Sequence, residues 1–326
     1  MIALDEERFD EALTLLAALE REFPSSTKVL MLEAEAHAGR RELDPARAIL
    51  DRAVVLAPND PDLLTHYGDL LNDWGDFVKA LSMLDRSLRI RPDDAATLTH
   101  RALTHLALQQ RDAARDDLDA AVAASPFLSS PRWVRAQYRA QAFDLAGALE
   151  DRLTWEQSRF DANGDVHVGL ILFALRDIPA AEPRLRRVVA DGKFPGHASL
   201  WWYLAALQLE GRDAVQAEFR RQVAALPADK RAGWPGPILA VYLGTSDLAT
   251  MDAAARQASP PDRSDRICEA NYYGAQWLVL SGRVEDALPR WREAERECPV
   301  AFFERFLSHA ELVRRQRLGE SAVAPD

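Results

Sequence analysis

The sequence predicts an all-α fold built as an array of antiparallel helix pairs, and three observations support this prediction. Prolines recur at a constant interval, at Pro24, Pro58, Pro92 and Pro126. Alanine and leucine keep the same phase, at Ala12, Ala46, Ala80 and Ala114, and at Leu16, Leu50, Leu84 and Leu118. No useful length of the chain alternates apolar and polar residues as a strand does. A fixed period of this size is typical of repeats that stack on one another.

The segment 7–24 is predicted as one amphipathic helix, because apolar residues recur at helical spacing and Pro24 ends the run. In the frame of the repeat it is the second half of a unit whose first helix would precede Met1. Its apolar flank at Phe9 and Leu13 therefore lacks its normal cover. We expect that residues 1–5 fold back over the flank, that the helix docks on another chain in self-association, or that the true start lies upstream.

The next three units are complete and span 27–60, 61–94 and 95–128. In the second of them, Asn59 or Asp60 can cap the first helix, and Pro61 suits its first turn. Small residues at fixed positions of the second helices let neighbouring helices approach closely. A regular array is therefore expected over residues 1–128, starting at half a repeat.

These positions resemble the tetratricopeptide repeat (TPR) family, whose period is about 34 residues. Unit 61–94 carries the family positions most completely, at Leu64, Tyr67, Gly68, Gly75, Ala80 and Pro92. The resemblance implies a right-handed superhelical solenoid with a terminal cap. It also implies a non-catalytic scaffold or adaptor that binds a protein or peptide partner.

The phase weakens after residue 128, so we expect degenerate TPR-like helix pairs over 129–228. Two prolines then interrupt the pattern, and 229–262 is predicted as an irregular insertion with short helices. A last TPR unit and a capping helix are expected over 263–318, and a disordered tail over 319–326.

Aromatic residues gather in two of the later segments. They are Trp201, Trp202, Tyr203, Tyr272, Tyr273 and Trp277. They could form an adhesive groove, but residues at helical spacing more often pack one unit on the next, so we expect at least half of them in the core.

Residues 165–315 are also similar to the C-terminal half of bacterial TPR proteins of the lipoprotein I (NlpI) type. The motif "CEA", the paired aromatics, "SGR…A" and the terminal "AEL" carry this similarity. It implies an adaptor for envelope enzymes, such as peptidoglycan enzymes or proteases, attached to the outer membrane by a lipid. The sequence has no signal peptide or lipid-bearing N-terminal Cys, which predicts a cytoplasmic protein as written, and a periplasmic or envelope protein if the N-terminus is incomplete.

Composition and charge exclude several classes of protein. Hydrophobic residues make up 48% and charged residues 28% of the 326 residues, as in a globular protein. The net charge of −11 argues against a nucleic-acid partner, which a basic face would bind. The sequence contains no apolar run long enough to span a bilayer, so no direct membrane insertion is expected.

No motif for catalysis or for a cofactor is present: HExxH, GxSxG, GxxxxGK[ST] and GxGxxG are all missing. We therefore expect no enzyme and no cofactor, with a regulatory subunit of an enzyme complex as the alternative. His66 and His100 occupy the same position in successive units, but no Cys or third His joins them, so no metal site is predicted.

The two cysteines lie at the start of one predicted helix and at the end of its partner. In an antiparallel pair these ends are neighbours, so Cys268 and Cys298 either form a disulfide or remain two reduced thiols. A disulfide would imply an oxidising compartment.

The TPR resemblance implies that the first helices line a concave, peptide-binding groove. The residues expected on it are Glu35, Thr65, Asp69, Asn72, Asp73, Thr99, Leu103, Trp133 and Gln137. Three of these are acidic beside apolar neighbours, which suits a basic or mixed peptide; the alternative is a merely solvated face. The pattern names neither the partner nor its motif.

Overall fold

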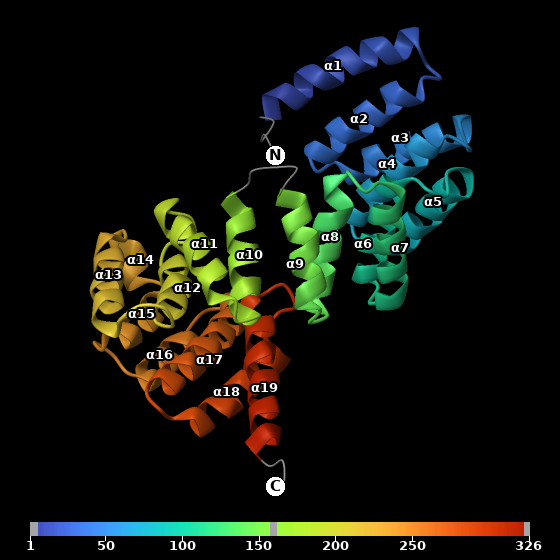
Figure 1. The fold of residues 1–326 in the computed structure, drawn as a ribbon. Helices are drawn as coiled ribbons and strands as arrows, with labels where there is room; N and C mark the ends of the chain where they lie inside the picture. Colours follow the sequence, from blue (N-terminus) through green and yellow to red (C-terminus); the bar gives the residue numbers. More distant parts are fainter. Residues whose placement is uncertain (1–5, 157–161, 323–326) are drawn as a thin grey trace. The chain divides into compact units, whose positions relative to one another are not determined.

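The computed structural model describes residues 6–156 and 162–322, which form nineteen helices and contain no strand (Figure 1). The predicted all-α solenoid of antiparallel helix pairs is thereby confirmed. The chain separates into two compact units, 1–135 and 136–326.

The first unit contains α1 (Glu6–Glu22), three complete helix pairs and the first residues of α8 (Ser129–Gln141). The pairs are α2 (Thr27–Gly39) with α3 (Leu43–Leu56), α4 (Pro61–Asp73) with α5 (Phe77–Ile90), and α6 (Ala95–Ala107) with α7 (Arg111–Ala124). The first helix of each pair also contacts the first helix of the next, α2 to α4 and α4 to α6. The first helices therefore form one continuous layer.

The shared phase of small and apolar residues has a direct packing explanation in this unit. In the three complete pairs, the alanines and leucines in phase are fully buried, namely Ala46, Ala80, Ala114, Leu50, Leu84 and Leu118. Gly68 on α4 lies so close to α5 that an added Cβ would stand 2.6 Å from Cγ of Leu84. Close approach of the two helices therefore requires glycine at this position.

Caps and turns repeat with the same period. Asp60 caps α4 by accepting hydrogen bonds from the backbone N–H of Asp62 and Leu63, and Pro61 occupies the first turn. The turn inside each pair places a residue in the left-handed region at one position, with φ of 62° at Arg41, 76° at Gly75 and 61° at Gln109.

The N-terminal helix is covered differently from the expectation. The ring of Phe9 lies against Gly39, where an added Cβ would meet it at 2.3 Å, so α2 covers the flank that was predicted to be bare. The exposed apolar side chains of α1 and its end lie instead at Leu15, Leu19 and Phe23. The flank prediction was wrong for Phe9, because α2 packs on the side of α1 that carries this residue.

The second unit contains the end of α8, three further helix pairs and three short helices. Helix α9 (Leu145–Glu156) follows α8, and the pairs are α10 (Ala162–Ala174) with α11 (Ile178–Ala190), α12 (His197–Ala206) with α13 (Arg212–Ala225), and α17 (Asp262–Leu280) with α18 (Val284–Glu297). The short helices α14 (Ala228–Ala232), α15 (Gly236–Leu243) and α16 (Leu248–Arg256) occupy most of the segment 229–262.

The last helix, α19 (Phe303–Ala322), packs on α18 and also contacts α17 and α10 (Figure 1). Because α10 and α17 are first helices of their pairs, α19 covers that side of the second unit. The helix includes 319–322 of the segment predicted as a disordered tail, and 323–326 lie outside the described residues.

The aromatic cluster is core, as predicted. Five of the six side chains are at most 5% exposed, namely Trp201, Trp202, Tyr203, Tyr272 and Tyr273. Trp277 is partly buried against the same core cluster. Across 6–156 and 162–322, no helix is both long enough and apolar enough to cross a membrane.

Candidate functional site

The layer of first helices in the first unit carries an acidic face. A hollow of 260 Å³ lies on α4, α6 and the turn between α5 and α6. Its lining contains Asp62, Thr65, His66, Asp69, Arg91, Asp94, Ala96 and His100. We call this hollow and the adjoining carboxylates of Glu35 and Asp73 the acidic face.

Two histidine–carboxylate pairs repeat along this face. Oε1 of Glu35 lies 3.5 Å from Nε2 of His66, and Oδ1 of Asp69 lies 2.7 Å from Nδ1 of His100. Each pair joins one first helix to the next, and the second pair occupies the same positions as the first, one unit further along the chain. The carboxylates of both pairs remain about half exposed, at 50% for Glu35 and 44% for Asp69.

Burial shifts the pKa of two groups on this face. Burial lowers the pKa of His66, although the carboxylates of Glu35 and Asp69 oppose this shift. His66 is therefore mostly neutral at pH 7 and does not cancel the carboxylates. Burial and the nearby charge of Asp69 raise the pKa of Asp73, which makes no ion pair with any described residue.

The negative charge of the hollow is partly neutralised at the end that Arg91 lines. Arg91 forms an ion pair with Asp62. Burial would raise the pKa of Asp94, but hydrogen bonds from Thr97 outweigh it and the pKa is lowered. Asp94 is thus an anion held in place by the N-terminus of α6, where it also caps the helix.

Two of the predicted groove residues make hydrogen bonds within the array. Thr65 contacts Oγ1 of Thr97 at 2.6 Å and Oγ of Ser87 at 2.8 Å. Asn72 donates to the backbone oxygen of His100 at 3.2 Å and accepts from Thr104 at 2.8 Å. These side chains hold neighbouring repeats together.

The remaining predicted groove residues divide between the units. Thr99 is buried and donates to the backbone oxygen of Ala95 at 2.6 Å. Leu103 and Trp133 are exposed by 41% and 37% and belong to the first unit. Gln137 belongs to the second unit, where it lines a different cavity.

The sequence reasoning missed the role of the histidines on the acidic face. The shared position of His66 and His100 was considered only for a metal site, and no pairing with a carboxylate was predicted. The signal that could have paired them is that the spacing from Glu35 to His66 equals the spacing from Asp69 to His100. Among the described residues, no group of three or more His, Cys, Asp or Glu could hold a metal ion.

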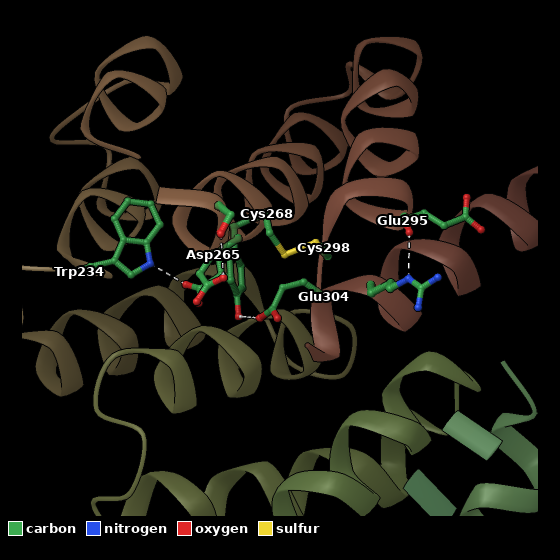
Figure 2. The surroundings of a disulfide bond; sticks show 10 residues. Trp234, Asp265, Cys268, Glu295, Cys298 and Glu304 are labelled. Atoms are coloured by element: carbon green, nitrogen blue, oxygen red, sulfur yellow. Dashed lines mark hydrogen bonds between the residues drawn. A yellow bond between two sulfur atoms is a disulfide. The ribbon is translucent and has the colours of Figure 1, made fainter. Parts of the chain in front are cut away.

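The second unit contains a buried polar network beside a disulfide (Figure 2). Cys268 on α17 and Cys298 at the end of α18 are bonded, with an S–S distance of 2.05 Å. Glu269 accepts a hydrogen bond from Nε1 of Trp234 at 2.7 Å and contacts Nε2 of His197 at 2.7 Å. Glu269 is 9% exposed, and its partners His197 and Trp234 are partly buried.

A second carboxyl completes this network. Tyr273 donates to Oε1 of Glu304 at 3.2 Å, and Glu304 is 3% exposed. Burial and the negative charge of Glu269 raise the pKa of Glu304 to about 7. Burial alone would lower the pKa of His197, but its hydrogen bond with Glu269 outweighs this and the pKa is raised. The network is thus a proton-dependent part of the core.

Comparison with known proteins identifies the repeats. Residues 3–65 and 169–230 each match a tetratricopeptide repeat model. No curated protein matches the chain.

Solved structures give the same fold. One is PilW, a type IV pilus biogenesis factor, with 16% identity and a TM-score of 0.53 over 60% of this chain and 90% of that chain. Another is the C-terminal part of a TPR repeat-containing protein from Cytophaga hutchinsonii, with 13% identity and a TM-score of 0.50 over 82% of this chain and 95% of that chain. Identities this low show the fold alone. The described residues therefore form an all-α TPR-type solenoid, with tetratricopeptide repeats matched over residues 3–65 and 169–230.

Proposed function

We propose that the chain is a non-catalytic scaffold that binds a basic segment of a partner protein on the acidic face of its first unit. The observation that carries this proposal is the pair of Asp69 and Asp73, one turn apart on α4, with Asp73 free of any ion pair among the described residues. Lysine or arginine side chains of a partner would relieve the repulsion between these two carboxylates.

The neighbouring groups set what kind of segment fits. Glu35 precedes the aspartates by one repeat, and Asp94 lies at the start of the next first helix. The exposed Leu103 offers an apolar contact on α6. An extended segment with basic residues and an occasional apolar one therefore matches the face in charge and in composition.

The two units differ in what covers their first helices. In the second unit, α19 contacts the first helices α10 and α17. In the first unit, the described elements leave the carboxylates of Glu35 and Asp69 about half exposed. The first unit is thus the better candidate for a partner segment.

The test is quantitative affinity capture from the native host with the variant Asp69→Lys/Asp73→Lys. Because each substitution reverses a charge on the face, we expect the captured partners to fall at least tenfold. Asp112→Lys/Asp116→Lys is the matched control, since these residues have the same spacing on α7 and are 90% and 69% exposed in their side chains. Equal capture by the double variant and the wild type would refute the proposal.

A second candidate function is the envelope adaptor of the lipoprotein I type. The disulfide between Cys268 and Cys298 favours it, because such bonds persist in oxidising compartments. Thiol alkylation of the protein in its native host tests this proposal: protection of both cysteines supports an envelope location, and two alkylated thiols in undisturbed cells contradict it.

A further inference from the structure

The second unit contains a cavity that plays no part in the proposed scaffold function. Its volume is 100 Å³, roughly seven to ten times the space that one water molecule needs. It lies between the end of α8, α9, α10 and the first turn of α19. The lining is mostly apolar, with Phe143, Ile171, Val300, Phe302, Phe303 and Phe306.

One positively charged side chain in this mostly apolar lining is Arg305. Arg305 lines the cavity, and its guanidinium lies 5.5 Å from the ring centroid of Phe143. Its Nε donates to the backbone oxygen of Glu295 at 3.1 Å. Its Nη1 is buried and has no hydrogen-bond partner among the residues that the structure describes.

The acidic side chains near Arg305 are already engaged. The carboxylate of Glu295 contacts Nδ1 of His309 at 2.6 Å, and Glu304 accepts from Tyr273. Within 6–156 and 162–322, Arg305 forms no salt bridge with a carboxylate. A buried donor without a partner costs free energy, and a charged one costs more.

Four further polar side chains lie in the same lining, namely Gln137, Gln141, Arg152 and His167. Arg152 is 2% exposed, and His167 lies edge-on to Phe303 at 5.0 Å between ring centroids. A ligand that enters therefore meets the guanidinium of Arg305 in a lining that is otherwise mostly apolar. Phosphate or sulfate would be attracted by the positive charge, but it would lose its hydration on contact with the phenylalanine rings, which costs free energy.

We propose that this cavity binds a monocarboxylate with a compact aliphatic body, the carboxylate accepting from Nη1 of Arg305. Both a free aliphatic acid and the C-terminal leucine of a peptide have this chemistry. The apolar body would lie against Ile171 and Phe306, and one negative charge would compensate the buried guanidinium.

The experiment is a ligand-observed saturation-transfer NMR titration of the full chain. The probes are 4-methylpentanoate, its uncharged amide, and an acetylated tripeptide ending in leucine as free acid or as amide. We expect at least one acid to bind tenfold more tightly than its amide. Tighter binding of 4-methylpentanoate than of the tripeptide acid identifies a small molecule as the source of the carboxylate. Tighter binding of the tripeptide acid identifies a chain terminus.

Variants locate the binding. Arg305→Gln should remove the preference for acid over amide, whereas Arg296→Gln, an exposed arginine outside the lining, should leave it unchanged. Ala140→Leu fills the apolar end and should abolish binding of every probe. Equal binding of acid and amide by the wild type, or no saturable binding by any probe, overturns the proposal even if Arg305→Gln does not fold.

Discussion

Reduction of the disulfide should destabilise the second unit. The size of the effect depends on the length of the loop that the disulfide closes. Cys268 and Cys298 are separated by 30 residues. A loop of that size costs about 12 cal/mol/K of chain entropy in the unfolded state, which is about 3.6 kcal/mol at 25 °C. The bridge ties α17 to the end of α18, so its loss should act on that pair first.

The assay is urea unfolding of the oxidised chain, the reduced chain and Cys268→Ser/Cys298→Ser, combined with hydrogen exchange resolved by segment. Reduction should lower the free energy of unfolding of α17 and α18, while α4 and α5 in the first unit serve as the internal control. A loss below about 1 kcal/mol would refute the loop-entropy reasoning. Two free thiols in the unfolded, unreduced protein would refute the bridge itself.

Three other outcomes follow from named contacts. Gly68→Ala places a Cβ 2.6 Å from Leu84, so chemical denaturation should show about 1–3 kcal/mol less stability; no change would mean that the two helices can separate freely. Glu304 has a folded pKa of about 7 against an ordinary value of 4.5, so its stabilising contribution is complete below pH 4.5 and is lost as the pH rises through 7. In urea unfolding, this titration should make the protein about 2 kcal/mol less stable at pH 7 than at pH 5, and Glu304→Gln should reduce the pH dependence by that amount; an unchanged pH dependence in the variant would contradict the assignment. Leu15→Glu/Leu19→Glu should abolish any self-association through α1 in light scattering at tens of micromolar, and a wild type that is monomeric there would exclude that contact.

The local architecture could be predicted because the repeat imposes the same packing demand in each unit. Alanines such as Ala46, Ala80 and Ala114 lie where one helix meets the next, and each is fully buried. The caps follow local rules too, as Asp60 and Pro61 show at the start of α4. Each of these features depends on residues close together in the sequence.

Contacts between distant segments could not be predicted in this way. Helix α19 contacts α10, which lies far earlier in the sequence, and no periodic pattern links them. The cavity beside Arg305 combines Ala140 with the α18–α19 turn, and no repeat position relates these two segments either. In the layer of first helices, the sequence predicted that Thr65 and Asn72 face a ligand, but their hydrogen bonds to the next repeat depend on side-chain direction across helices.

Hydrogen exchange of the full chain, alone and saturated with a partner recovered by affinity capture, tests the central claim most directly. Binding on the acidic face predicts slower exchange in α2, α4 and α6, with α3, α5 and α7 unchanged. Protection confined to the second helices of the first unit, or to the second unit, would contradict the assignment of the binding face.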